Sequence, residues 1–407
     1  MGAEPHAATL RVPNAAEIDY GRLKAGRLAR LQEALRFHEL PVCLFYSPAN
    51  VRYATGVGLM TVWTQGAFFR YCLVPAEGAP ILFEYPDAMH VAERAFDDVR
   101  PAKTWQFEGG PEAWTYARRW AAELRSLLRE LGFPDGPLGL DRLDAIGFLA
   151  LQEAGIQVVD ASAATVDARE VKTSEEVQLM VLNGAIGDAM LAAFEAAIRP
   201  GVREYELLAV LSDALLRRQG EGLFTRLVAS GPNTNPWMSE AQDKLVMPGD
   251  LVGVDTDACG FEGYVIDVSR TFLCGGQPTS GQRDAYRTAH ECVAGMVDLI
   301  QPGLTFEEFV RRAPRLPERY RPQRYAVMAH QAGLDDEGPS IPYPEDVEER
   351  DAVIPERTLR ENMVLCLECY AGEVGAPFGV KLEDQVLITA RGGARLCTYP
   401  YDAALLG

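Results

Sequence analysis

The sequence is short of basic residues, with 39 lysines and arginines against 58 aspartates and glutamates and a formal net charge of −19. Such an excess of negative charge repels phosphate backbones and anionic membrane surfaces, so we expect no nucleic acid and no membrane among its partners. The first residues also lack the basic start and apolar core of a signal peptide, and we expect no later run to approach a membrane span. These absences predict a cytoplasmic protein.

A disulfide framework is lacking as well, because the eight cysteines are scattered through 407 residues, as is typical of reduced thiols. Cys366 and Cys369 form a C-x-x-C, but no second pair exists. The surrounding segment, MVLCLECYAG, is typical of a buried strand. We therefore assign these two thiols to the core rather than to a metal or redox site.

Two patterns of residues divide the chain near positions 160–172. Before this point, apolar runs such as PVCLFYS (41–47) and PILFEY (80–85) alternate with helical stretches such as 114–131, which is an α/β pattern. After it, Thr173 followed by Ser-Glu-Glu predicts the start of a helix. We predict an α/β N-terminal domain over 1–165 and a second domain over 166–407.

The second domain contains a weak internal repeat. Segments 192–211 and 294–313 each contain a helical pattern, then Pro-Gly, then an acidic helix start. One interpretation is a duplicated helix pair, which would frame a site along a pseudo-twofold axis. The other is two ordinary connections between helices, and the repeat alone does not decide between them.

Acidic residues and one histidine lie on separate apolar strands of this domain. Because side chains alternate along a strand, Asp255 and Asp257 should point to one face, and a hairpin would bring Asp267 opposite them. Glu368 ends the apolar run MVLCLE, and Glu383 lies in GVKLEDQVLIT. The candidate metal-binding residues are Asp255, Asp257, Asp267, His330, Glu368 and Glu383.

Burying so many carboxylates without partners would be costly. Two shared divalent cations are the simplest compensation, and oxygen-rich ligation with one nitrogen suits Mn, Fe, Co or Zn. The alternative is that each acid forms its own salt bridge at a strand end or turn. The occurrence of all six together favours the cations.

The order Asp, Asp, His, Glu, Glu, with GYVIDVSRTF and KLEDQVLIT, resembles the pita-bread superfamily of creatinase, prolidase, aminopeptidase P and methionine aminopeptidase. The resemblance is strong over about 170–407. It implies a creatinase/prolidase-type α/β N-terminal domain and an α+β pita-bread catalytic domain with an internal pseudo-twofold repeat.

The sequence departs from the peptidases of that superfamily at two histidines. Trp237 stands where the first is expected and Asp336 where the second is expected, and the chain has only five histidines in all. The doubled aspartates of DTD (255–257), the segment TRLVASGPNTNPW (225–237), Asp336-Glu337 and the end TYPYDAALLG resemble the dimethylsulfoniopropionate (DMSP) lyases of this fold.

That resemblance implies the six residues above as ligands of two divalent ions, with iron favoured over Mn, Zn or Co, in a homodimer acting on a small molecule. It implies Asp336 as the catalytic base and Tyr325 as a substrate-side residue. A carboxylate bound to two cations has a more acidic α-proton, which an unligated aspartate could remove as a sulfonium leaves. We also expect Trp237 and Glu337 to border the substrate.

The N-terminal domain offers further residues that could contact a substrate. In MTVWTQGAFFRYC (60–72), Trp63, Phe68, Phe69 and Arg70 could form an aromatic lid across a dimer interface, with the arginine holding a substrate carboxylate. The alternative is a core strand with packed aromatics. Both interpretations stay open.

Three functions follow from these residues. The first is β-elimination on DMSP or a related sulfonium acid. The second is a lyase for a larger, aromatic substrate whose C–C bond breaks to release an aldehyde such as formaldehyde; Gly338, where a Trp is more usual in the lyases, and the N-terminal aromatics motivate it. The third is an Xaa-Pro-type peptidase, which Trp237 and Asp336 oppose.

Overall fold

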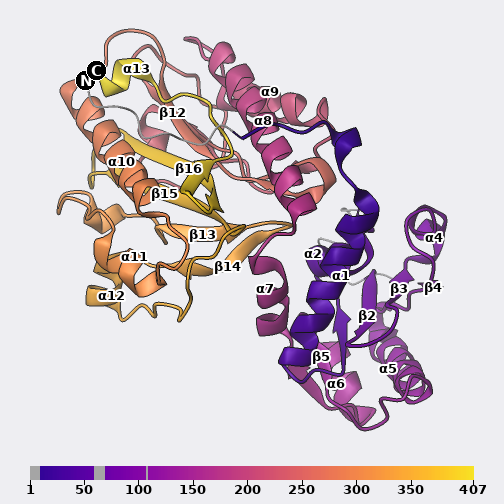
Figure 1. Ribbon diagram of the computed structural model, residues 1–407. Coiled ribbons are helices and arrows are strands. Elements are labelled where there is room, and N and C mark those ends of the chain that lie inside the picture. Colours follow the sequence, from indigo (N-terminus) through magenta and orange to yellow (C-terminus); the bar gives the residue numbers. More distant parts are fainter. Residues whose placement is uncertain (1–9, 59–68, 107–108) are drawn as a thin grey trace. The chain divides into compact units, whose positions relative to one another are not determined.

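The computed structural model describes residues 10–58, 69–106 and 109–407, and these fall into two compact units (Figure 1). Residues 19–169 form one unit. Residues 170–407 form the other, together with the described residues that precede Asp19. Each unit is described separately.

The N-terminal unit is built on a six-stranded mixed sheet in the order β4-β3-β2-β1-β5-β6. Its core contains the apolar strand residues together with Trp105 and Trp120. Its strands are β1 (Val42–Phe45), β2 (Tyr71–Pro75), β3 (Ile81–Glu84), β4 (Val99–Pro101), β5 (Leu138–Leu140) and β6 (Val158–Asp160). Its helices are α1 (Tyr20–Phe37), α2 (Pro48–Thr55), α4 (Met89–Ala92), α5 (Ala113–Glu130), α6 (Ala145–Glu153) and α7 (Ser162–Glu170), the last of which ends at the first residue of the other unit. The α/β pattern of this half is confirmed.

The larger unit combines three sheets with two pairs of helices. The sheets have the strand orders β11-β10-β7, β12-β9-β8 and β14-β13-β15-β16-β17. Its helices are α8 (Ser174–Ala197), α9 (Glu204–Leu216), α10 (Ser280–Leu299), α11 (Phe306–Arg312), α12 (Pro344–Arg350) and α13 (Ala403–Leu406). Its strands are β7 (Gly222–Leu223), β8 (Val228–Ser230), β9 (Leu251–Asp255), β10 (Ala258–Cys259), β11 (Val265–Ile266), β12 (Ser269–Leu273), β13 (Ala329–Ala332), β14 (Asp336–Ile341), β15 (Val364–Gly372), β16 (Gly379–Thr389) and β17 (Gly392–Arg395).

The two helix pairs are built alike, which supports a duplicated half-domain. Thr173 caps α8 and Thr279 caps α10, and each forms a reciprocal capping box with the residue three positions on. Both pairs are joined through a Pro-Gly whose glycine, Gly201 or Gly303, has a positive φ that an L side chain rarely adopts. The predicted helix start at Thr173 and the internal repeat are both confirmed.

By its length and apolar composition alone, helix α8 could cross a membrane. The expectation that no run approaches a membrane span is therefore wrong for this segment. In the structure, Met190, Leu191 and Phe194 are buried in an apolar core with residues of β9 and β12. A core helix of a globular protein meets the same two criteria.

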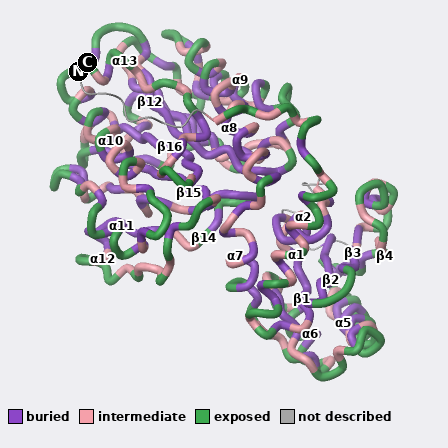
Figure 2. Tube along the Cα trace, viewed as in Figure 1, coloured by how far each residue is buried: buried purple, intermediate pink, exposed green. Residues whose placement is uncertain are grey.

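Strands β15 and β16 lie in the interior of this unit and are buried along almost their whole length (Figure 2). Helix α10 packs on both strands (Figure 1), and β9 and β12 also contact β16. Because both of its faces are covered, β15 is a nearly continuous apolar run, and even the polar residues of β16 are buried. Polar side chains within them therefore need a specific explanation.

Candidate metal centre and active site

Most of the polar residues of β15 and β16 lie on one face. Along β15, the alternate residues from Leu365 to Ala371 belong to the apolar core that includes α10. Because successive side chains point to opposite faces of a strand, Cys366 and Glu368 lie on the other face. The same alternation in β16 puts Leu382 in the core and Lys381, Glu383 and Gln385 on the face away from it.

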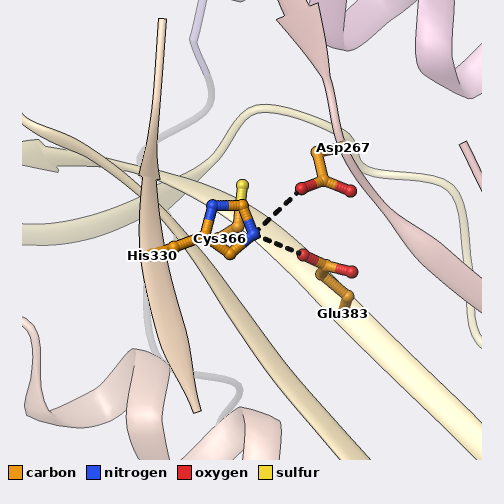
Figure 3. A group of neighbouring side chains, drawn as sticks. All are labelled: Asp267, His330, Cys366 and Glu383. Atoms are coloured by element: carbon orange, nitrogen blue, oxygen red, sulfur yellow. Dashed lines mark ion pairs between the residues drawn. The ribbon is translucent and has the colours of Figure 1, made fainter. Parts of the chain in front are cut away.

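Strand pairing then assembles part of a site on this face. Glu368 pairs directly with Glu383, and His330 of β13 pairs with Cys366. The His330 Nε2 atom lies 3.1 Å from Asp267 Oδ2, 3.7 Å from Glu383 Oε1 and 3.8 Å from Glu368 Oε1. Figure 3 shows the imidazole directed at the Asp267 and Glu383 carboxylates. The structure thus brings together four of the six residues predicted to bind metal.

The remaining two predicted ligands, Asp255 and Asp257, come from the predicted hairpin, whose geometry differs from the expectation at Asp257. Asp255 ends β9 opposite Ser269, and Ala258 of β10 pairs with Ile266 of β11. Asp257 lies between these two ladders with φ at 30°, so it breaks the strand. The expectation that regular alternation places Asp255 and Asp257 on one face is therefore wrong, although both reach the same site.

Five of the six residues, together with Cys366, form two overlapping groups, and Glu368 lies beside the second through His330. Ligand atoms of Asp255, Asp257 and Asp267 all lie within 4.8 Å of one another, and so do those of Asp267, His330, Cys366 and Glu383. Asp267 belongs to both groups, as a carboxylate bridging two ions would. Two groups sharing a carboxylate suit a pair of divalent cations.

The charges of the site also suit cations. Within the described residues, Asp255 Oδ1, Asp267 Oδ1, Glu368 Oε1 and Glu383 Oε1 are buried without a hydrogen-bond partner. Orphaned buried oxygens of this kind are costly, and a metal ion would satisfy them. The donor set therefore fits two divalent ions.

The pKa values of the carboxylates reflect the same crowding of negative charge. Burial and the charge of Asp255 raise the pKa of Asp257 to about 7. Burial, opposed by Lys381, raises the pKa of Glu368 to about 8. For Glu383, burial is outweighed by the charges of Lys381 and His330 and by the Lys381 hydrogen bond, which hold its pKa below the usual range.

Lys381 is a central residue of the site that the sequence analysis did not single out. It is fully buried, and its Nζ lies 2.8 Å from both Glu368 Oε2 and Glu383 Oε2 and 3.1 Å from Asp255 Oδ2. A signal was present in the sequence, since Lys381 precedes Glu383 by two residues and so shares its strand face.

Asp336, the predicted base, begins β14 at the edge of the same sheet. Asp336 is exposed to solvent, although protein atoms surround much of its carboxylate. This partial desolvation raises its pKa to about 6, opposed by the charge of His330 and reinforced by Asp335, Glu383 and Asp255. An acid with a pKa near 6 is a competent general base at neutral pH.

Two predicted aromatic residues flank the cluster. The Lys381 ammonium lies 4.4 Å from the centre of the Tyr325 ring. Trp237 is buried in a small apolar cluster with Leu227, Ala229 and Tyr370, against which Tyr325 packs. The Trp237 indole Nε1 has no hydrogen-bond partner among the described residues.

Other predicted substrate-binding residues lie in different surroundings. Arg70 is buried in the N-terminal unit, with its Nε 2.6 Å from Glu84 Oε2. Glu337 is buried and pairs with Lys172 at 3.3 Å. These ion pairs favour structural roles for both residues. Trp63 and Phe68 lie outside the described residues.

Comparison with known proteins places these features in a family. Residues 178–390 match the model of metallopeptidase family M24, and residues 27–171 match that of the creatinase/prolidase N-terminal domain.

One curated relative is the dimethylsulfoniopropionate lyase DddP of Roseovarius nubinhibens, 32% identical over 96% of this chain and 89% of that protein. The Xaa-Pro dipeptidase of Pyrococcus furiosus is also 32% identical, over 56% of this chain and 64% of that protein. Among solved structures, the Xaa-Pro dipeptidase from Bacillus anthracis superposes with a TM-score of 0.74 at 20% identity, over 93% of this chain and 99% of that one. The last likeness establishes the fold, a creatinase-type N-terminal domain followed by a pita-bread domain.

Proposed function

This chain belongs to metallopeptidase family M24, and we propose that it is a metal-dependent lyase of this family that cleaves DMSP to dimethyl sulfide and acrylate. The observation that carries the proposal is Asp336: an unligated carboxylate with a pKa of about 6, beside a metal-binding cluster. Likeness to the R. nubinhibens lyase over nearly the whole chain supports it.

The residues that would hold two divalent ions are Asp255, Asp257, Asp267, His330, Glu368 and Glu383. When bound, such ions would polarise the substrate carboxylate and make the adjacent C–H more acidic. Iron as the metal and a homodimer belong to the same proposal, because they come from the resemblance to the lyases. A cytoplasmic location is a further part of the proposal.

Asp336 would remove the proton from the carbon next to the carboxylate. The electron pair of that C–H bond forms the double bond of acrylate, the bond from the next carbon to sulfur breaks, and dimethyl sulfide leaves with that electron pair. The Tyr325 and Trp237 rings would border the sulfonium end, where aromatic faces attract a cation. Because burial raises the Tyr325 pKa above its ordinary value, its phenol would stay neutral during turnover.

The test measures headspace dimethyl sulfide from protein loaded with iron or manganese and given millimolar DMSP. We expect release by the wild type and loss of about 100-fold or more in Asp336→Asn, the range for removing a general base, with bound metal unchanged. Asp335→Asn is the matched control, since it removes a neighbouring acid and should retain most activity.

The peptidase function has its own support in the P. furiosus dipeptidase likeness. The same metal-loaded protein is therefore given an Xaa-Pro dipeptide. Cleavage of the dipeptide without dimethyl sulfide would overturn the lyase proposal. Silence on both substrates from protein holding two ions per chain would overturn it in favour of a larger lyase substrate.

A further inference from the structure

The Cys366 thiol lies inside the metal-binding cluster rather than in the core. Its Sγ is within 4.8 Å of ligand atoms of Asp267, His330 and Glu383 (Figure 3). It stands directly across the β13–β15 ladder from His330 and two residues before Glu368 on the same face. The predicted buried strand is confirmed, but the Cys366 thiol faces this cluster and not the apolar core that contains α10.

Its neighbour in the C-x-x-C provides an internal contrast. Cys369 is three residues further along β15, so its side chain points to the opposite face. There it belongs to the apolar core that also contains Cys292 of α10. One thiol of the pair thus faces apolar side chains, and the other faces carboxylates and an imidazole.

The surroundings of the Cys366 sulfur suit a metal ligand. The Gln385 side-chain amide donates to Cys366 Sγ at 3.8 Å and to the Val265 carbonyl at 3.2 Å. Hydrogen bonds donated to a ligating sulfur are a usual means of orienting and tuning it. Nearby, Asp267 Oδ1 and Glu383 Oε1 are buried and have no hydrogen-bond partner in the described part of the chain.

We propose that Cys366 binds one of the two cations and joins Asp267, His330, Glu368 and Glu383 in a mixed sulfur, nitrogen and oxygen subsite for a thiophilic divalent metal. This rests on the two-metal centre of the proposed function. Binding forms a metal–sulfur bond and releases the thiol proton to solvent, and needs no oxidant or reductant. Sulfur ligation favours Zn²⁺, Co²⁺ or Fe²⁺ over Mg²⁺, Ca²⁺ or Mn²⁺.

A consequence is that the two metal positions are unequal. Asp255, Asp257 and Asp267 offer only oxygen, whereas the Cys366 subsite adds nitrogen and sulfur. Softer donors bind the later first-row metals more tightly. The first equivalent of cobalt or zinc should therefore enter the Cys366 subsite.

Cobalt(II) titration of chelator-treated full-length protein tests the assignment without any substrate. We expect the first equivalent to produce a sulfur-to-cobalt charge-transfer band in the near ultraviolet. Cys366→Ser should lose this band and bind the first equivalent more weakly, on the order of 10-fold or more, as for perturbed metal sites. Cys369→Ala, which removes the thiol on the other face, should keep the band and the wild-type affinity for the first equivalent.

The wild type alone can refute the proposal, whether or not the variants fold. If it binds two cobalt ions per chain without the band, Cys366 is not a ligand. A band that survives in folded Cys366→Ser refutes the assignment as well. X-ray absorption of the zinc form gives a second readout, with one sulfur expected at about 2.3 Å from the metal.

The outcome is separable from that of the proposed function. A charge-transfer band without dimethyl sulfide release would support Cys366 as a ligand and refute the proposed lyase activity. Release of dimethyl sulfide by a protein that holds two cobalt ions but shows no band would support the lyase activity and refute Cys366 as a ligand.

Discussion

Replacing Lys381 by methionine should destabilise the metal-free protein far more than the metal-loaded one. The Lys381 ammonium contacts three carboxylates, those of Asp255, Glu368 and Glu383, at 2.8–3.1 Å in a fully buried position. Removing one partner of a buried ion pair typically costs about 3–5 kcal/mol, because the remaining charge is left uncompensated. We expect a loss of that size at pH 7 in the presence of chelator.

Metal ions should shrink this loss by at least half, because a bound cation neutralises the same carboxylates. Amide hydrogen exchange of peptides from β15 and β16 measures the effect, since it reports the opening free energy of this unit alone. Lys381→Arg keeps the charge and should lose less stability than Lys381→Met.

Lys172→Met is the matched control. Lys172 is also buried and pairs with a carboxylate, Glu337, outside the proposed ligand set. Its substitution should destabilise the unit equally with and without metal. Equal losses for Lys381→Met in both conditions would refute the inference that its charge is coupled to the metal site.

Three further predictions concern charge and packing. In the presence of chelator, the stability of the larger unit should fall as the pH rises from 5 to 8. The pKa values of Asp257 and Glu368 are raised to about 7 and about 8, so the folded state binds more protons than the unfolded state. Hydrogen exchange measures this trend, which should be weaker with metal bound. Asp384→Ala should cost about 3–5 kcal/mol, because it strands buried Arg270, 2.9 Å away, while metal stoichiometry stays at the wild-type value. Tyr325→Leu removes the aromatic face and should lower kcat/KM for DMSP by up to about 30-fold, the worth of a desolvated cation–π contact, with metal content unchanged. An unaltered kcat/KM would exclude the ring as a contact of the sulfonium.

The elements that local chemistry determines could be predicted from the sequence. Thr173 with Glu176 specifies a capping box, and the apolar run ending in Glu368 specifies a buried strand. The six candidate ligands were found because charged residues at apolar strand ends need compensation.

The surroundings of Cys366 depend on which face of its strand it occupies. Since both faces of β15 are buried, its apolar run gives no periodic signal to separate the Cys366 face from the Cys369 face. Only the pairing of Cys366 with His330 of β13 and Gln385 of β16 distinguishes the two faces. Likewise, the partner of Arg70, Glu84, is set by the tertiary structure, not by local sequence.

The choice between elimination and hydrolysis rests on residues outside the ligand set, since the same six ligands could serve either reaction. Peptide hydrolysis must supply a proton to the departing amine, which calls for a general acid beside the metals. A sulfonium leaves as a neutral sulfide and needs no proton. Of the histidines that the structure describes, His330 alone lies in the site, where it faces the carboxylates; His290 packs against Tyr401. A site with the Asp336 carboxylate outside the proposed ligand set, and with its histidine among the proposed ligands, is therefore better suited to the proposed elimination.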